Sequence, residues 1–355
     1  MKLSHVIDEL VEERGLDREL LSNIICEGML AAYMKKYPEL TLSVKHNKKT
    51  DELEVEVNKQ VVSVVKDEES EISLRKARNI DPNIELEGAV WVPFEQPIGR
   101  IEILRAKQVI ANMIRNIEAA AIYEEYIAKQ GTIVLGTIHK CERGGMTIKI
   151  GETLAFLPKS FSIPTDKCIV GYSIRALLKD VLKEPRNDNQ LVLDRASTEF
   201  VQRLFELEIP EVFEKLVEIK KIVRIPGYKS KVVVVSHDKN VDPVGTCVGV
   251  GGVRIKPILK ELGSEKIDVI AYSSTPETMV ANALKPAVIN RVELVNDNNA
   301  DIWLDEDQRS LAIGKMGQNI ALASQLTGIS INLVQSKEDR EQQDIQIEDL
   351  EMSEE

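Results

Sequence analysis

The chain has 355 residues, which is too long for one ordinary domain and favours several small globular units. Hydrophobic residues make up 43% of the chain but aromatic residues only 4%, so the cores must consist mainly of aliphatic side chains. A formal net charge of −12 excludes a protein that coats nucleic acid with its whole surface, so any such site must be local.

The first predicted unit, residues 1–128, begins with helices and continues with a sheet. Residues 17–37 carry apolar side chains at helical spacing behind an aspartate that can cap the helix. Residues 53–57 alternate between apolar and acidic side chains, which is the period of a strand, and we expect further strands at 61–65 and 89–92.

A long helix is predicted over residues 100–129. At 1.5 Å per residue it would extend ~40 Å, enough to lie on the N-terminal sheet and lead into the next unit. Its expected buried stripe has helical spacing and consists of Ile103, Ile110, Ile114, Ile117 and Ala121.

Residues 131–196 contain five short apolar or alternating runs separated by turns, which is the size and pattern of an OB-type β-barrel. The expected strands are 131–139, 146–150, 154–157, 174–181 and 190–193.

Two further units, residues 203–275 and 276–336, share one order of predicted elements, in which a helix, a glycine break and a second helix lie between strands. The two breaks lie 65 residues apart, which indicates a tandem repeat of a small α/β module. Residues 337–355 hold nine acidic and two basic residues and too few apolar ones to order themselves, so they are expected to form a disordered acidic tail.

The glycine breaks carry the chemistry. Each is a GXXG motif, and their residues are Gly249, Val250, Gly251 and Gly252, and Gly314, Lys315, Met316 and Gly317. Glycine lacks Cβ, so a sugar–phosphate backbone can lie directly on such a loop, while the next helix begins with free N–H groups and a positive dipole end. One GXXG is weak because glycine is common at helix ends, but two in the same frame indicate paired KH modules, which bind single-stranded nucleic acid.

Charge near the first motif supports this interpretation. Residues 229–260 hold six basic residues against two acidic ones in a chain that is acidic overall. Arg254 and Lys256 directly follow the first motif, and Gln318 follows the second, so we include all three in the predicted RNA site. The alternative for the basic residues is a solvated helix face.

Other phosphate-binding and catalytic patterns fail. A Walker loop ends in GK[ST], whereas Met316 follows Lys315, and a dinucleotide fingerprint needs a glycine where Arg254 stands. The four histidines have no metal-ligand spacing, and neither GxSxG nor HExxH occurs. We therefore expect no enzymatic activity, no metal site and no cofactor.

The four cysteines, Cys26, Cys141, Cys168 and Cys247, are scattered and form no CxxC pair, so we expect reduced thiols. The charged N-terminus is unlike a signal peptide, and no apolar stretch of about 18 residues could cross a membrane. These features predict a cytoplasmic protein without membrane contact.

Five separated stretches, in this order, resemble the NusA family of bacterial transcription termination/antitermination proteins. They are residues 106–110, 204–212, 242–249, 280–287 and 311–319. The resemblance spans residues 1–336 and implies a multidomain α+β fold: an N-terminal α/β domain with a long helix, an S1-type OB barrel and two tandem type II KH domains.

The resemblance also implies a function. The family's N-terminal domain binds RNA polymerase core near the RNA exit channel, and the barrel and KH pair receive nascent single-stranded RNA. The family prolongs pausing, assists intrinsic termination and joins other antitermination factors. Basic family residues that face exit-channel RNA match Lys35, Lys36, Arg100 and Lys107, for which a solubilising surface charge is the alternative.

Three departures from the family accompany the resemblance. Gly251 stands where the family usually has a basic residue, and Phe156 and Phe161 suit a barrel core better than a base-stacking platform. The acidic tail is too short for the folded acidic repeats of some members.

The alternative function is a KH/S1-type protein of ribosome assembly or RNA turnover; an exoribonuclease subunit would need clustered metal-binding carboxylates. We expect a monomer.

Overall fold

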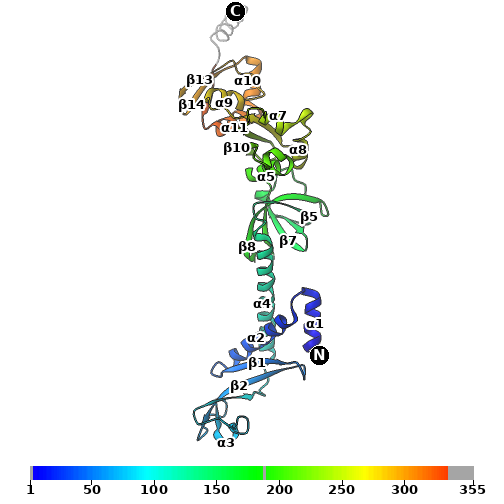
Figure 1. The fold of residues 1–355 in the computed structure, drawn as a ribbon, viewed down its shortest axis with the longest axis vertical. Coiled ribbons are helices and arrows are strands. Elements are labelled where there is room, and N and C mark those ends of the chain that lie inside the picture. Colours follow the sequence, from blue (N-terminus) through cyan, green and yellow to red (C-terminus); the bar gives the residue numbers. More distant parts are fainter. Residues whose placement is uncertain (1–2, 187–188, 335–355) are drawn as a thin grey trace, which may run out of the picture. The chain divides into compact units, whose positions relative to one another are not determined.

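The structure is a computed structural model that describes residues 3–186 and 189–334, so the predicted acidic tail lies outside the described residues. The chain divides into two compact units, residues 1–122 and 123–355, and each is described by itself. Both mix helices with sheets, which confirms the α+β class (Figure 1). None of the described helices combines the length and apolar character that crossing a bilayer requires.

The first unit is a four-stranded sheet with helices. β2 pairs antiparallel with β1 and β4 and parallel with β3. The elements are α1 (Leu3–Arg14), α2 (Arg18–Lys36), β1 (Leu42–Asn47), β2 (Glu52–Val62), β3 (Glu71–Ser73), α3 (Leu74–Ala77), β4 (Ala89–Pro93) and α4 (Arg100–Ile127). Asp17 caps α2 as predicted, because its carboxylate accepts hydrogen bonds from the backbone N–H groups of Glu19 and Leu20.

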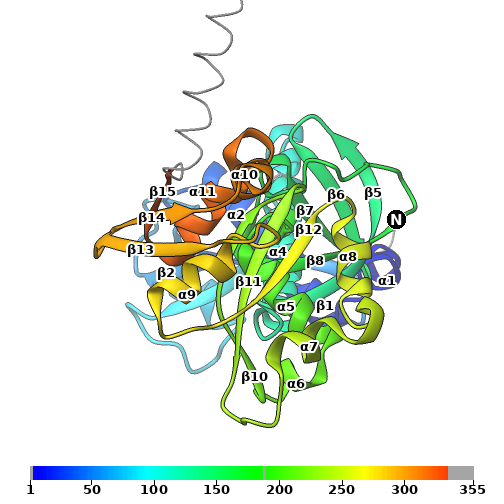
Figure 2. The ribbon, with the colours of Figure 1, turned by 90° about the horizontal axis from the view of Figure 1, so that it is seen from above.

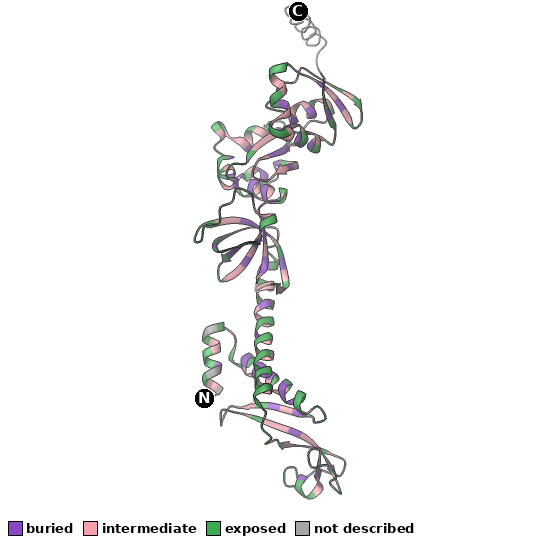
Figure 3. Cartoon of the chain, turned by 180° about the vertical axis from the view of Figure 1, so that it is seen from behind, coloured by how far each residue is buried: buried purple, intermediate pink, exposed green. Residues whose placement is uncertain are grey.

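The predicted stripe on α4 is correct only in its middle. Ile114 is buried against α1 and α2, and Ile110 and Ile117 are partly buried there. Ile103 is 42% exposed and Ala121 is exposed, so these two assignments are wrong. Figure 3 shows exposed residues along much of the length of α4. Periodicity shows which residues share a helix face but not how far along the helix its neighbours extend.

Five strands of the second unit close into a barrel in the order β5-β6-β7-β9-β8, which confirms the predicted architecture. They are β5 (Ile133–Glu142), β6 (Gly145–Ile150), β7 (Thr153–Pro158), β8 (Ser173–Arg186) and β9 (Asn189–Asp194), with a short helix η1 (Lys159–Phe161) after β7. Phe156 and Phe161 are both half-buried, and the ammonium group of Lys179 lies 3.7 Å from the ring centre of Phe161.

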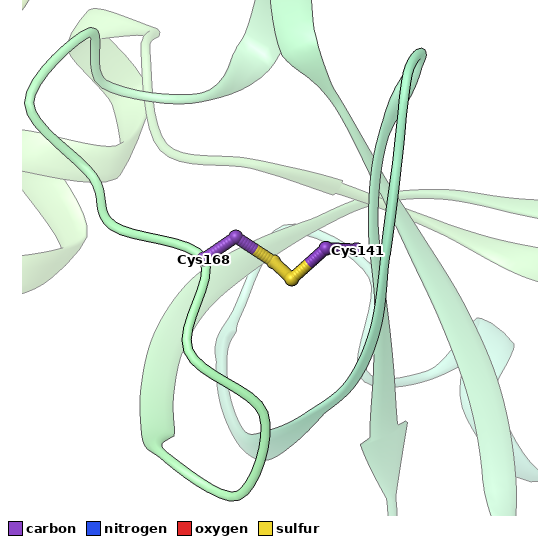
Figure 4. Close-up of a disulfide and its surroundings, with 2 residues drawn as sticks. All are labelled: Cys141 and Cys168. Carbon is purple, nitrogen blue, oxygen red and sulfur yellow. A yellow bond between two sulfur atoms is a disulfide. The ribbon is translucent and has the colours of Figure 1, made fainter.

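The expectation of four reduced thiols is wrong for two of them. Cys141, near the end of β5, forms a disulfide with Cys168, in the segment before β8 (Figure 4). The two are 27 residues apart in sequence, but barrel closure brings their Cα atoms to 6.0 Å. Cys26 and Cys247 are free thiols.

Two modules of one topology follow the barrel. In each three-stranded sheet the first two strands are antiparallel and the third is parallel to the second, which confirms the tandem repeat (Figure 2). The first module contains α5 (Thr198–Glu208), α6 (Pro210–Phe213), β10 (Val217–Ile225), β11 (Lys229–Ser236), α7 (Pro243–Val248), η2 (Val250–Gly252), α8 (Lys256–Leu262) and β12 (Lys266–Ala271). The second contains α9 (Pro276–Ala283), β13 (Arg291–Asn296), β14 (Asn299–Trp303), α10 (Glu306–Ile313), η3 (Lys315–Gly317), α11 (Gln318–Thr327) and β15 (Ser330–Val334).

Strand β11 is buried on both faces. Val232 and Val234 belong to the core of the first module, whereas Val233 lies in the core of the second together with Val223 and Ile270. Alternate side chains of a strand point to opposite faces, so the run of consecutive valines serves two cores. The sheet of the first module is therefore one wall of the second module.

Candidate nucleic-acid interface

The first glycine loop is an open turn between α7 and α8. Its three glycines have positive φ, with values of +75° at Gly249, +65° at Gly251 and +77° at Gly252. Val250, at the tip, is 95% exposed. A Cβ added to Gly251 or Gly252 would meet no heavy atom within 4 Å, so another molecule can approach this backbone directly.

The second glycine loop repeats this geometry between α10 and α11. Gly314 and Gly317 have φ of +72° and +74°, and Met316 also adopts positive φ, at +55°. Met316 is 87% exposed and Lys315 is exposed, while Gln318 is half-buried at the first turn of α11. Both loops thus present main chain, with apolar or basic tips, to solvent.

Asn319 packs against the second loop from the inside of the module. The sequence analysis did not place this residue in the site. It is buried, and its side-chain amide donates hydrogen bonds to the backbone oxygens of Leu284, Leu311 and Ala312, each at 3.2 Å. A Cβ at Gly314 would lie 2.6 Å from Cβ of Asn319, so the loop packs closely on this side chain. The available signal was only its place in the stretch 311–319.

The first loop has less free positive charge beside it than the sequence predicts. Arg254 donates to the carboxylate of Glu211 at 2.6 Å and to the backbone oxygen of Thr246 at 3.1 Å. This hydrogen bond from Arg254 lowers the pKa of Glu211, so the pair stays ionised and largely neutralises the arginine. Lys256 is exposed. The role of Arg254 in RNA binding stays a prediction, and its packing against Gly249 shows that it also supports the loop.

Two of the six basic residues counted near the first loop add little free positive charge, because Lys231 is buried and Lys229 is half-buried and paired. Lys231 is completely buried, and both it and Lys229 contact Asp268, at 2.9 and 2.7 Å. Burial lowers the pKa of Lys231, and Asp268 opposes that shift. Lys229 also donates to Asn319 at 3.4 Å, so these lysines join the two modules and do not form a basic surface.

A buried arginine joins the barrel to the first module. Arg195 is 97% buried and contacts both oxygens of Asp166, at 2.9 and 3.0 Å, in the segment before β8. It also donates to the carboxylate of Glu261, at 2.6 Å, and to the backbone oxygen of the same residue at 3.0 Å. Glu261 lies on α8, the helix after the first glycine loop, so barrel and loop share one network.

The four basic residues predicted in the N-terminal unit lie on two helices. Lys35 and Lys36 are exposed in the last turn of α2, and Arg100 and Lys107 are exposed on α4. The ammonium group of Lys36 donates to the backbone oxygen of Pro97 at 2.9 Å, which brings the end of α2 beside the start of α4. The structure thus places Lys36 beside the segment that precedes α4, while the role of all four stays a prediction.

Models of one protein family match this chain along most of its length. Family models match for the NusA N-terminal domain over residues 2–120, the NusA-like first KH domain over 195–272 and the NusA-like second KH domain over 276–341. The solution structure of the N-terminal domain of NusA from B. subtilis is 28% identical, covers 33% of this chain and 95% of that chain, and has a TM-score of 0.26.

Two curated relatives extend the similarity over nearly the whole chain, and both are transcription termination/antitermination proteins. NusA of Thermus thermophilus is 35% identical over 347 residues, which cover 93% of this chain and 89% of the relative. NusA of Bacillus subtilis is 33% identical over 344 residues, which cover 95% and 92%. The chain therefore belongs to the NusA family of transcription termination/antitermination proteins.

Proposed function

We propose that this protein is an RNA-binding transcription elongation factor of the cytoplasm that acts as a monomer. Its N-terminal unit binds RNA polymerase core, and its two KH modules bind nascent single-stranded RNA. Together with other antitermination factors it modulates pausing, intrinsic termination and antitermination. The observation that carries this proposal is the pair of exposed glycine loops, which have matching backbone conformations in modules of one topology.

Each glycine loop would hold the sugar–phosphate chain on its exposed main chain. Positive φ at the glycines turns the backbone sharply, and the open space at Gly252 and Gly317 leaves room for a phosphate. Lys256 and Lys315 supply positive charge beside the two loops, and the apolar tips Val250 and Met316 offer surfaces for bases.

Tethering reconciles such a local site with an acidic protein. The net charge of −12 disfavours non-specific RNA binding from solution. A protein already bound to the polymerase, however, would meet the emerging transcript at an effective concentration of roughly millimolar order, so weak contacts suffice. The exposed Lys35, Lys36, Arg100 and Lys107 would face RNA at the polymerase exit channel.

The test replaces one glycine in each loop, in the double variant Gly252→Asp with Gly317→Asp. Each new carboxylate would stand where a phosphate should bind, so RNA affinity should fall by about 100-fold or more, because like charges at close range repel. The measurement is a titration of the full-length protein with fluorescently labelled single-stranded RNA.

The matched control is the double variant Gly252→Asn with Gly317→Asn. Asparagine has the shape of aspartate and tolerates the left-handed conformation, so it separates charge from size and strain. Both double variants should melt close to the wild-type temperature. Equal RNA affinity for the aspartate variant and the wild type would rule out the glycine loops as the binding site.

The polymerase contact needs its own measurement, because a ribosome-assembly or RNA-turnover protein would share the RNA chemistry. The full-length protein should co-purify with RNA polymerase core after nuclease treatment, which removes any bridging RNA. Loss of the complex under that treatment would favour the alternative function.

A further inference from the structure

The segment between η1 and β8, residues 162–172, packs against the first module, and we call it the docking segment. All of it lies within the described part of the chain, and it contains no helix or strand. Ile163 is 1% exposed and belongs to the apolar core of the first module. A Cβ added to Gly227, in the turn between β10 and β11, would lie only 3.2 Å from Pro164 and 3.3 Å from Ile163.

A buried polar network continues this contact to α8. Asp166 of the docking segment accepts hydrogen bonds from the guanidinium group of Arg195 at 2.9 and 3.0 Å. The same guanidinium group donates to the carboxylate of Glu261 on α8 at 2.6 Å. Any displacement of Asp166 must therefore move Arg195 or break its contacts, and Arg195 in turn holds the helix that follows the first glycine loop.

The disulfide attaches the docking segment to the barrel (Figure 4). Cys168 follows Asp166 closely in the sequence and is bonded to Cys141, near the end of β5. Farther along, the backbone N–H of Gly171 donates to the oxygen of Ile138 on β5 at 2.9 Å. The disulfide thus holds the segment at a point between its polar contact with the first module and its return to β5.

Thiol chemistry of this chain concentrates on that one pair. Cys141 and Cys168 are both exposed, so a reductant in solution can reach the bond. Desolvation raises the pKa of Cys26 and raises the pKa of Cys247 to about 12. The thiolate is the reactive form of cysteine, so these two free thiols are poor participants in exchange.

We propose that Cys141 and Cys168 form a reversible redox site that sets how tightly the barrel is coupled to the first module. In the oxidised state the disulfide fixes the docking segment on β5, and the network of Asp166, Arg195 and Glu261 transmits this restraint to α8. In the reduced state the segment keeps its other contacts but gains freedom, so the network opens more often.

The reaction is thiol–disulfide exchange with a dithiol. A thiolate of the dithiol attacks one sulfur of the disulfide, a mixed disulfide forms, and the other cysteine leaves as a thiolate. The second thiolate of the dithiol attacks the mixed disulfide, which closes the reductant into a disulfide and releases the second cysteine. Two electrons and two protons pass from the dithiol to the cysteine pair, and the reverse reaction restores the bond. Disulfides in a reducing cytoplasm, the compartment proposed above, are usually transient or redox-sensing.

Hydrogen exchange of the full-length protein tests the coupling. The protein is compared in the oxidised state and after reduction with a dithiol under native conditions, and mass spectrometry verifies the redox state. The amides of α8 should exchange about 3- to 10-fold faster in the reduced protein, although α8 lies outside the loop that the disulfide closes. The amides of β2, in the first unit, are the internal reference and should exchange equally in both states.

A pair of matched variants tests the route of the coupling. Asp166→Asn removes the charge that holds Arg195 but keeps the disulfide, so α8 should exchange equally fast in both redox states. Glu208→Gln removes a carboxylate from a second ion pair between the barrel and the first module, with Arg175 at 2.7 Å, and should keep the redox difference. Circular dichroism verifies that both variants are folded.

A third variant tests the cysteines themselves. Cys141→Ser/Cys168→Ser should show the α8 exchange of the reduced wild type and should not respond to the dithiol. A response of this variant to the dithiol would assign the effect to another group and overturn the proposal.

Three further results would overturn the proposal. A disulfide that reacts with the dithiol only after unfolding would be a structural cross-link. Equal exchange of α8 in both redox states would show that the network transmits no restraint, and a redox difference that persists in Asp166→Asn would exclude this route. None of these measurements involves RNA or polymerase, so their outcome is independent of the proposed function.

Discussion

The two glycines of the second loop have different roles although their φ angles are nearly equal. Gly314 has φ of +72° and faces Asn319 at close range, whereas Gly317 has φ of +74° and faces open space. For the stability of the fold, Gly314 is required for packing as well as for conformation, and Gly317 for conformation alone. A matched pair of substitutions can therefore separate packing from backbone strain.

Gly314→Ala should destabilise the second module by about 3 kcal/mol or more, because it adds a collision with Asn319 to the strain of a left-handed alanine. Gly317→Ala should cost only about 1–2 kcal/mol, the strain alone. Urea unfolding followed by the fluorescence of Trp303 measures both, in a background with Trp91→Phe because the chain has two tryptophans. Equal costs for the two variants would contradict the close packing at Gly314.

At the scale of elements, one polar cluster attaches α1 to the rest of the first unit. The hydroxyl and the backbone N–H of Ser4 donate to Asp51 at 2.6 and 3.0 Å. Nε2 of His46 lies 3.2 Å from Asp51, and Nδ1 lies 3.0 Å from the hydroxyl of Ser22 on α2. The cluster therefore connects two helices with the turn between β1 and β2.

This connection should depend on pH. The hydrogen bond from Ser4 lowers the pKa of Asp51 below its usual value of 3.8, so the ionised carboxylate stabilises the fold above that value. The stabilisation is lost as pH falls through the lowered pKa of the folded state. Asp51→Asn should lower the urea midpoint of the first unit at pH 7, and the difference from wild type should shrink below about pH 3.8.

Trp91 fluorescence in a Trp303→Phe background measures this effect, since Trp91 lies on β4 in the same unit. Asp51 has φ of +59°, a conformation that asparagine tolerates, so the substitution adds little strain of its own. A difference that stays constant from pH 7 to pH 3 would show that the carboxylate charge is not involved.

Elements with a strong pattern were predictable from the sequence, and elements with mixed patterns were not. The consecutive valines of β11 correctly predicted a buried strand, and Asp17 correctly marked the start of α2. The strand β10, VEIKKIVRI, was missed because its lysines interrupt the alternation, and β1, LSVKHN, was too short and polar. Strand pairing with a stronger neighbour overrides such local preferences.

The candidate site was predictable to a similar degree. The two glycine loops follow from the local sequence, because both the motif and its flanking helices are local. Other features depend on residues distant in sequence: the ion pairs of Lys229 and Lys231 with Asp268, the pairing of Arg254 with Glu211, and the Cys141–Cys168 bond. No spacing rule reveals such contacts, because folding, not chain order, brings the partners together.

At the scale of the second unit, Arg195 lies between the barrel and the first module, which also share an apolar core that includes Ile163 and Leu177. Arg195→Met should destabilise the protein by about 3–5 kcal/mol, because it leaves the carboxylates of Asp166 and Glu261 without their partner. Calorimetry should then show the barrel melting separately from the first module.

The control for this variant is Arg175→Met. Arg175 also connects the barrel to α5, through Glu208 at 2.7 Å, but its side chain is 39% exposed. Solvent screens such a pair, so the loss should be about 1 kcal/mol or less. If both variants lose a similar amount of unfolding free energy, the burial of Arg195 adds no stability to the contact between the barrel and the first module.

The apolar core that the two modules share through β11 also has a consequence for folding during translation. Val223, Val233 and Ile270 are synthesised before the side chains of the second module that pack on them. During translation the first module is therefore complete when the second emerges. Its apolar surface is a template on which the second module can fold. A cut in the chain between the two modules would separate the second module from this template and expose apolar surface on both fragments.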